Sequence, residues 1–272
     1  MRRRSVLSCA GAIALPGALC ACAGAVHQLP SIAGDRVGLA QTEIANAAPP
    51  TRRAVAREET EAMLNAVWDK LAYPASLTCR EMNVGVCDWR IRVSGDRALN
   101  ASAGPGGEIV LNLGIFEHAA NEAELALVLA HEIGHQAANH IEQARRNTTV
   151  GAVIGGLLMG VLMAAATYRS NDGGRATRDA MEVGANTGGR IGRISYSKEQ
   201  EREADYLAAV MLYRGAFDLD QARGFLLTMA RLSGRTETGL LDTHPAGPDR
   251  IAAWDAAVAE IRAADGKLPK RA

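Results

Sequence analysis

Apolar and polar residues recur along the chain in two patterns, one typical of helices and one typical of short strands. Residues 53–71 carry apolar side chains at helical spacing, and the Tyr73-Pro74 pair that follows predicts the end of this helix. The segment DWRIRVSG, residues 88–95, alternates between polar and apolar residues and predicts a strand. A Gly-Pro-Gly-Gly turn at 104–107 precedes a second predicted strand at 108–113.

Three later helices are predicted from capping pairs, in which a polar residue is followed three positions later by Glu or Gln. The pairs are Asn121 with Glu124, Ser197 with Gln200, and Asp218 with Gln221. Their helices are expected to run to about residues 139, 215 and 234. A last helix is expected from near residue 248 to just before Gly266.

The N-terminal stretch MRRRSVLSCAGAIALPGALCAC has the anatomy of an export signal. Three arginines precede an apolar run that is too short and too glycine-rich for a membrane anchor, which predicts a signal peptide over residues 1–21. The run ends in Leu-Cys-Ala-Cys, which resembles a bacterial lipobox and predicts lipidation of Cys22. Ordinary cleavage after Ala23 or Ala25 is the alternative.

The signal also predicts the location and the domain layout. A chain exported in this way is expected in the periplasm, and a lipoprotein without Asp after Cys22 is expected to be anchored to the outer membrane. Residues 22–50 lack periodicity and end in Ala-Ala-Pro-Pro, so they are predicted to form a flexible tether. One domain is then expected over residues 51–265, followed by a short tail at 266–272.

The charge balance bears on the class of binding partner, and the cysteine content bears on the redox compartment. The chain has 30 Lys and Arg against 30 Asp and Glu, and this balance argues against a nucleic-acid partner. Cys79 and Cys87 are the cysteines that lie beyond the leader. In an oxidising compartment they are expected to form a disulfide that closes CREMNVGVC, with two free buried thiols as the alternative.

The chemistry is concentrated in LVLAHEIGHQAANH, residues 127–140. His131 and His135 are four residues apart, so on a helix their imidazoles point to one place, where two nitrogens can bind a zinc ion. Glu132 lies beside a ligand and is suited to act as the general base on water. Two histidines that merely form hydrogen bonds on an amphipathic helix are the alternative.

A third ligand is predicted in SKEQEREADYLAAV, residues 197–210. Glu201 and Asp205 share one face of this helix, so Glu201 can complete a His-His-Glu set while Asp205 accepts the second ring N–H of a liganding histidine. Glu199 and Glu203 are expected to face away and to be solvated or to act as helix-dipole charges. Three protein ligands leave a fourth position for water, which is typical of catalytic rather than structural zinc sites.

An insertion at residues 148–195 interrupts the domain between these ligands. Its apolar part, residues 150–167, approaches the length of a membrane-spanning helix. A single span there would place the histidines and Glu201 on opposite sides of a bilayer. We therefore expect a flap that gates the site, a re-entrant hairpin, or a helix that lies on protein or lipid.

Four segments, NASAGPGGEIVLN, ELALVLAHEIGHQAANH, YSKEQEREADYLA and THPAGPDRI, occur in this order along the chain. They resemble the signatures of the zinc metallopeptidase family that includes the CAAX prenyl proteases, HtpX, the mitochondrial Oma-type proteases and the periplasmic BepA/LoiP-type proteases. The resemblance covers roughly residues 55–262 and implies an α+β, zincin-like (gluzincin) fold that is mostly helical with a small mixed sheet. The residues after 262 show no helical-repeat pattern, so the repeat domain of BepA-like members is expected to be missing.

The resemblance assigns roles residue by residue. His131, His135 and Glu201 match the family's ligands for one Zn²⁺ per chain, Glu132 its base, and Asp205 the acid behind a ligand. His244 and Arg250 match positions near the metal, where His244 would stabilise an oxyanion or serve as a fourth ligand. The remaining histidines are expected to have no part in the site; they are His27, His118 and His140.

The function expected from these residues is that of an exported zinc endopeptidase that cleaves misfolded or unassembled envelope proteins. Its polypeptide substrates are expected to bind extended along a sheet edge formed by GEIVLNL, residues 107–113, unless this is an ordinary buried strand. A zinc-bound chaperone or assembly factor with latent or no proteolysis is the alternative function.

Overall fold

A computed structural model describes residues 25–146, 196–232 and 247–272, together with His244 and isolated positions between 149 and 182. The predicted signal peptide, Cys22 and most of the predicted insertion at 148–195 lie outside the described residues. Among the helices that the structure does describe, none is both long enough and apolar enough to cross a bilayer.

The sheet has three strands, β1 (Arg90–Ser94), β2 (Ala101–Ala103) and β3 (Glu108–Asn112), in the order β1-β3-β2. Strand β1 is parallel to β3, and β2 is antiparallel to it, so the sheet is mixed as expected. The expectation that residues 107–113 form a sheet edge is wrong, because β3 is the central strand. Pattern reasoning missed β2 because its Ala-Ser-Ala sequence has low strand propensity.

The turn between β2 and β3 depends on its glycines. Gly106 and Gly107 have φ angles of 72° and 82°, which side chains disfavour. A Cβ on Gly107 would also lie 1.9 Å from the Asp88 carbonyl oxygen. Glycine at 107 therefore lets this turn fold tightly against the start of β1 and brings β2 alongside β3.

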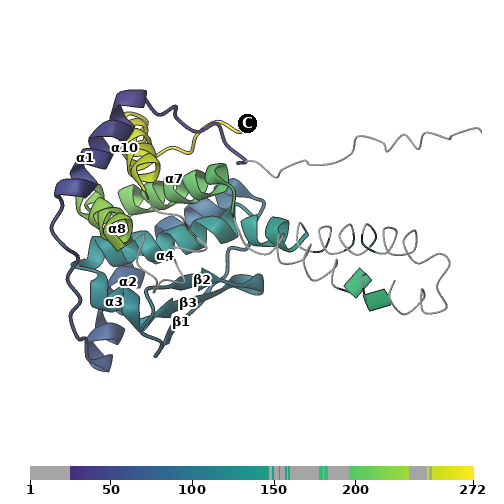
Figure 1. Ribbon diagram of the computed structural model, residues 1–272, viewed down its shortest axis with the longest axis horizontal. Helices are drawn as coiled ribbons and strands as arrows, with labels where there is room; N and C mark the ends of the chain where they lie inside the picture. The colour runs from purple at the N-terminus through teal and green to yellow at the C-terminus, as the bar shows by residue number, and fades with distance from the viewer. Residues whose placement is uncertain are drawn as a thin grey trace, which may run out of the picture.

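Helix α4 (Glu122–Ala137) is the centre of the domain and lies between the sheet and α7 (Figure 1). Every residue of α4 after Glu122 is buried. The surrounding helices are α2 (Arg57–Met82), α3 (Leu113–His118), α7 (Lys198–Arg214), α8 (Leu219–Leu232) and α10 (Pro248–Ala263). The mostly helical α+β fold expected from the sequence is confirmed.

The predicted capping pairs are all present. The Asn121 side chain accepts a hydrogen bond from the Glu124 N–H, and Asp218 accepts one from the Gln221 N–H. Ser197 and Gln200 form a reciprocal capping box. These caps fix where α4, α7 and α8 begin, and two of these helices carry the residues of the site.

Helix α2 continues through Pro74, so the predicted end at Tyr73-Pro74 is wrong. A proline inside a helix costs about 3 kcal/mol. Here Pro74 is itself buried, and Leu71 and Ala75 on either side of it are fully buried in the core. The burial of this face of the helix offsets the cost of the proline. The sequence around Pro74 alone does not indicate that this face is buried.

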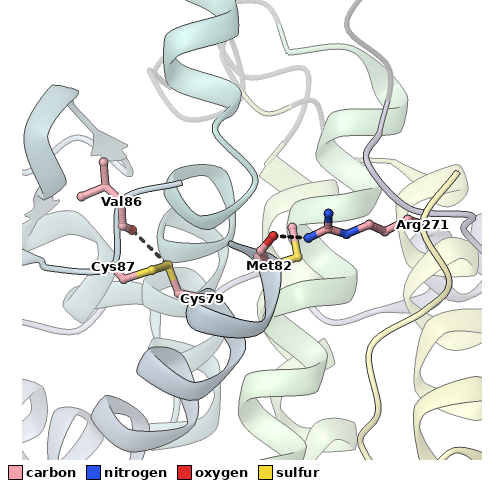
Figure 2. Close-up of a disulfide and its surroundings, with 5 residues drawn as sticks. All are labelled: Cys79, Met82, Val86, Cys87 and Arg271. Atoms are coloured by element: carbon pink, nitrogen blue, oxygen red, sulfur yellow. Dashed lines mark hydrogen bonds between the residues drawn. A yellow bond between two sulfur atoms is a disulfide. The ribbon is translucent and has the colours of Figure 1, made fainter. Parts of the chain in front are cut away.

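The end of α2 is tied to its surroundings by the expected disulfide. Cys79 and Cys87 are bonded, with their Cα atoms 5.6 Å apart, and Cys79 Sγ lies near the Val86 carbonyl oxygen (Figure 2). The Arg271 side chain donates a hydrogen bond to the Met82 carbonyl oxygen in the last turn of α2. The C-terminal tail therefore packs on the same end of α2.

The predicted tether at 22–50 differs from the structure, because residues 34–46 form helix α1 (Gly34–Asn46). This helix packs on α8 and α10 (Figure 1). Arg223 of α8 donates to both carboxylate oxygens of Glu43 at 2.6 Å and also to Asp255 of α10. The segment carries few apolar residues, so its helix is stabilised by these tertiary contacts rather than by its own pattern.

Candidate metal centre

Helix α4 places two imidazoles side by side. His131 is 4% exposed and His135 is fully buried. Their Nε2 atoms lie 3.1 Å apart, as expected for residues one helical turn apart that point to the same place. Two imidazole nitrogens this close, both turned inward, form half of a metal site.

Helix α7 brings a carboxylate to the same place. Gly134 allows the close approach, since a Cβ there would lie 2.9 Å from the Ala204 carbonyl oxygen. Glu201 Oε1 lies 3.3 Å from His135 Nε2, and Glu201 Oε2 lies 3.4 Å from His131 Nε2. The structure thus brings together the three residues that the sequence singled out as ligands.

His244 adds a fourth donor. Its Nδ1 lies 3.1 Å from His131 Nε2 and 2.8 Å from Glu201 Oε1. The four donor atoms of His131, His135, Glu201 and His244 all lie within 4.8 Å of one another, and all four residues are buried.

The donor set fits zinc. With bonds of about 2.0–2.2 Å, the edges of a tetrahedron around zinc are about 3.3–3.6 Å long, close to the separations here. Glu201 Oε2 is buried and has no hydrogen-bond partner among the described residues. A cation at the centre of the cluster would satisfy this oxygen and the inward-facing nitrogens together.

Charge in the cluster favours a bound cation. Burial raises the pKa of Glu201, but the three imidazoles of His131, His135 and His244 around it outweigh burial and hold the pKa well below its usual value. Burial lowers the pKa of His135 well below its usual value. An ionised carboxylate and a neutral imidazole are the forms that bind metal.

Asp205 and Arg250 hold His131 from behind. Asp205 Oδ1 lies 2.8 Å from His131 Nδ1, so it accepts the ring N–H that is turned away from the cluster. Arg250 donates to both oxygens of Asp205, at 2.7 and 2.8 Å. Burial raises the pKa of Asp205, but Arg250 and His131 outweigh it and lower it to about 2.

Glu132 lies beside the cluster and faces a cavity of about 490 Å³. Its Oε1 is buried, has no hydrogen-bond partner among the described residues and lies 3.6 Å from His244 Nε2. The lining of the cavity includes β2, the turn that follows it, Glu132, Tyr196 and His244, and also Arg145. A substrate in this cavity would lie against the Glu132 carboxylate.

Tyr196 was not identified from the sequence. Its ring stacks on that of His135, with centroids 3.9 Å apart, and it lines both the 490 Å³ cavity and a second one of about 300 Å³. Burial raises the pKa of its hydroxyl, and Glu132 and Glu201 raise it further. Tyr196 directly precedes Ser197, the N-cap of the helix that carries Glu201, and this position could have indicated that its side chain lies near the site.

Two residues expected away from the site are buried behind it instead. Glu203 is 1% exposed, so the expectation that it is solvated is wrong, whereas Glu199 is exposed as expected. His140 is fully buried, with Nδ1 3.0 Å from His135 Nδ1. Helix α4 ends at Ala137 and Asn139 adopts a φ of 60°, which turns His140 back toward His135.

His27 lies behind the site as well. It is 4% exposed, and its Nδ1 lies 2.7 Å from Glu203 Oε1. The expectation that it lies in a flexible tether is therefore wrong, while it is not among the metal-binding residues of the cluster. His27 and His140 together bury Glu203. Periodicity in the sequence does not indicate where the segments that carry these two histidines pack.

A His-Glu-x-x-His helix crossed by a helix that supplies a buried glutamate defines a zinc-dependent metallopeptidase domain. The chain belongs to peptidase family M48, whose model matches residues 58–258. The donor set above and this family agree on zinc as the cofactor. The domain is thus a zinc-dependent metallopeptidase domain of this family.

Curated relatives support the same family. A putative beta-barrel assembly-enhancing protease of Vibrio cholerae is 32% identical over 198 residues, which is 70% of this chain and 38% of the relative. The beta-barrel assembly-enhancing protease of Escherichia coli is 36% identical over 57% of this chain and 31% of its own length. The mitochondrial metalloendopeptidase OMA1 of Arabidopsis thaliana is 26% identical over 60% of this chain and 30% of its own. The chain therefore spans about a third of the length of these relatives.

Proposed function

We propose that the protein is an exported zinc endopeptidase that hydrolyses peptide bonds in misfolded or unassembled proteins of the bacterial envelope. The observation that carries the hydrolytic role is the buried Glu132 carboxylate, which lines the cavity beside the His-His-Glu cluster and whose Oε1 has no hydrogen-bond partner among the described residues. The envelope role is supported by the export signal in the sequence and by the relatives named as beta-barrel assembly-enhancing proteases.

The residues divide the work of hydrolysis among them. His131, His135 and Glu201 would hold zinc, which when bound polarises the scissile carbonyl and acidifies water. Glu132 Oε1 would take a proton from the attacking water and pass it to the departing amine. Asp205 and Arg250 keep the Nδ1–H of His131 turned away from the metal, so that Nε2 is the atom that would bind zinc once its own proton has left.

Substrate would bind extended along β2. Its residues, Ala101–Ala103, line the cavity that Glu132 faces, and β2 pairs with β3 along its other edge. A peptide added to this edge would be recognised mainly through its main chain. This mode accepts many sequences but requires a segment that is unfolded, which suits a role in removing misfolded proteins.

Anchoring to the outer membrane through a lipid on Cys22 is part of the proposal. The test is fractionation of cells that express wild-type protein or Cys22→Ala. The wild-type protein should sediment with the outer membrane, and Cys22→Ala should move to the soluble periplasmic fraction. If both forms are soluble, the leader is removed by ordinary cleavage instead.

His244 favours one second candidate, a chaperone or assembly factor whose proteolysis is latent. Its Nδ1 lies among the other donor atoms, so it can occupy the position that a water or substrate needs. If this is the function, His244→Ala should convert an inactive protein into an active peptidase, and the wild-type protein should protect an unfolded client without cleaving it.

The decisive experiment compares casein cleavage by the wild-type protein, by the same protein after chelation, and by Glu132→Gln. Loss of a general base typically costs about 10²–10⁴ in rate, so Glu132→Gln should be nearly inactive while it keeps its zinc. Glu199→Gln, an exposed residue on the same helix as Glu201, is the matched control and should cleave normally.

A genetic arm separates cleavage from binding. Glu132→Gln should fail to rescue an envelope-assembly defect that wild-type protein rescues. Full rescue by this variant would show that binding rather than hydrolysis is the function.

A further inference from the structure

A second chain of buried polar side chains lies behind His135, on the side away from the zinc cluster. His135 Nδ1 lies 3.0 Å from His140 Nδ1. The other nitrogen of His140, Nε2, lies 3.1 Å from Glu203 Oε2. Both imidazoles are fully buried and Glu203 is 1% exposed, so these contacts are shielded from solvent.

The outer end of the chain is held by the segment that precedes α1. The backbone N–H groups of Val26 and His27 donate to the two carboxylate oxygens of Glu203, at 2.8 and 3.0 Å. This segment also pairs with the C-terminal tail, through Gln28 N–H to the Lys270 oxygen and Ala272 N–H to the Val26 oxygen. Glu203 therefore joins the N-terminal segment to the zinc site.

The hydrogen bonds fix where the ring protons lie. Glu203 accepts from two backbone N–H groups, so its carboxylate is an acceptor, and the His140 nitrogen that faces it donates. A neutral His140 then has an unprotonated Nδ1, which accepts from the Nδ1–H of His135. The proton on His135 Nδ1 leaves Nε2 free to bind zinc.

The two imidazole ligands would then have separate supports from one helix. Asp205 orients His131 directly, and Glu203 orients His135 through His140. Along α7, Glu201 faces the metal cluster, Glu203 supports His135 through His140, and Asp205 supports His131. Such outer contacts typically contribute 10–100-fold to metal affinity.

We propose that His140 and Glu203 are positioning residues for the zinc ligand His135, and that the docked segment around Val26 and His27 anchors this chain. The proposal rests on the zinc-binding role assigned to His135, but not on proteolysis. It couples the packing of the N-terminal segment to the affinity of the metal site.

The test is the zinc dissociation constant of the full chain, measured by competition with a chromophoric chelator. His140→Ala should bind zinc roughly 10- to 100-fold more weakly. His140→Asn keeps an acceptor oxygen near the position of Nδ1 and should recover most of this loss. His118→Asn, a histidine outside the chain, is the matched control and should bind as tightly as the wild-type protein.

Two results would overturn the proposal. One is unchanged affinity in His140→Ala, and the other is an Asn variant as weak as the Ala variant, which would indicate packing rather than hydrogen bonding. A protein that binds zinc tightly but cleaves nothing would refute the proposed function and leave this inference standing. Conversely, if the wild-type protein cleaves casein and the three variants bind zinc with equal affinity, the proposed function would stand and this inference would be refuted.

A measurement on the zinc-loaded wild-type protein avoids the risk that a variant fails to fold. Nitrogen-15 NMR of histidine side chains distinguishes the two neutral tautomers. His140 should carry its proton on Nε2 and none on Nδ1, and a proton on Nδ1 of His140 would contradict the proposed chain of hydrogen bonds.

His27→Ala should weaken zinc binding less than His140→Ala does, because the two backbone donors to Glu203 remain.

Discussion

At the scale of single residues, Glu132 and Glu201 show how two buried carboxylates of one site take different roles. Glu201 is surrounded by three imidazoles that keep it ionised, so it is suited to hold a cation. Glu132 is turned to the cavity and keeps one oxygen without a hydrogen-bond partner among the described residues. Such an oxygen is available to accept a proton from water.

His131 makes zinc binding depend on pH. Burial and Arg250 lower its pKa, but Asp205 and Glu201 outweigh them and raise it to about 9 in the absence of metal. Below that pH a proton occupies Nε2 and must leave before zinc binds. Zinc affinity should therefore rise with pH, by up to about tenfold per unit, and level off near pH 9.

Calorimetry of the metal-free protein in buffers with different ionisation enthalpies checks this prediction. Near pH 7.5, zinc binding should release about one proton from this histidine. Binding that releases none, with an affinity that does not change between pH 7 and 9, would show that His131 is already neutral.

At the scale of elements, the site depends on how closely α7 crosses α4. Gly134→Ala would raise the helix propensity of α4 by about 1 kcal/mol, but the new Cβ would lie 2.9 Å from a backbone oxygen of α7. Overpacking of this kind costs about 1–3 kcal/mol, so the clash should win. We expect lower stability and weaker zinc binding, because Glu201 moves away with α7.

Urea unfolding and zinc titration of Gly134→Ala test this prediction. Gly38→Ala on α1 is the control, since a Cβ there has nothing within 4 Å. It should stabilise the protein slightly and leave zinc binding unchanged. If the two variants behave alike, the close crossing of α4 and α7 does not limit the site.

The elements also show what the sequence could predict. Local signals are reliable here, and the caps at Asn121, Ser197 and Asp218 begin helices as expected. The histidines and Glu201 could be placed because helical spacing fixes which side chains share a face.

The errors arose where tertiary contacts override local pattern. Pro74 is accommodated by burial, and β2 forms because β3 offers it a partner. His140 was placed on the far side of a helix that in fact ends at Ala137. Its contact with His135 depends on the turn at Asn139, which no periodicity indicates.

At the scale of the whole molecule, the residues before the matched family region are part of the domain. Helix α1 packs on α8 and α10, and the segment before it pairs with the C-terminal tail. Both ends of the described chain therefore meet on one side of α7, behind the metal site.

Two neighbouring positions on α1 test this integration. Ala40 is 3% exposed and Leu39 is 61% exposed. Ala40→Glu would bury an unpaired charge and should lower the free energy of unfolding by about 2–4 kcal/mol, with a fall of several degrees in Tm. Leu39→Glu should change it by less than about 0.5 kcal/mol. Equal melting temperatures for both variants would mean that residues 34–46 are a tether after all.

The central claim is that α4 and α7 hold one zinc ion between them. Anomalous X-ray diffraction across the zinc absorption edge, on crystals of the purified protein, tests it most directly. We predict one zinc per chain, about 2.0–2.2 Å from the Nε2 atoms of His131 and His135 and from a carboxylate oxygen of Glu201. Zinc bound elsewhere, or a Glu201 carboxylate that does not reach the metal, would contradict the account.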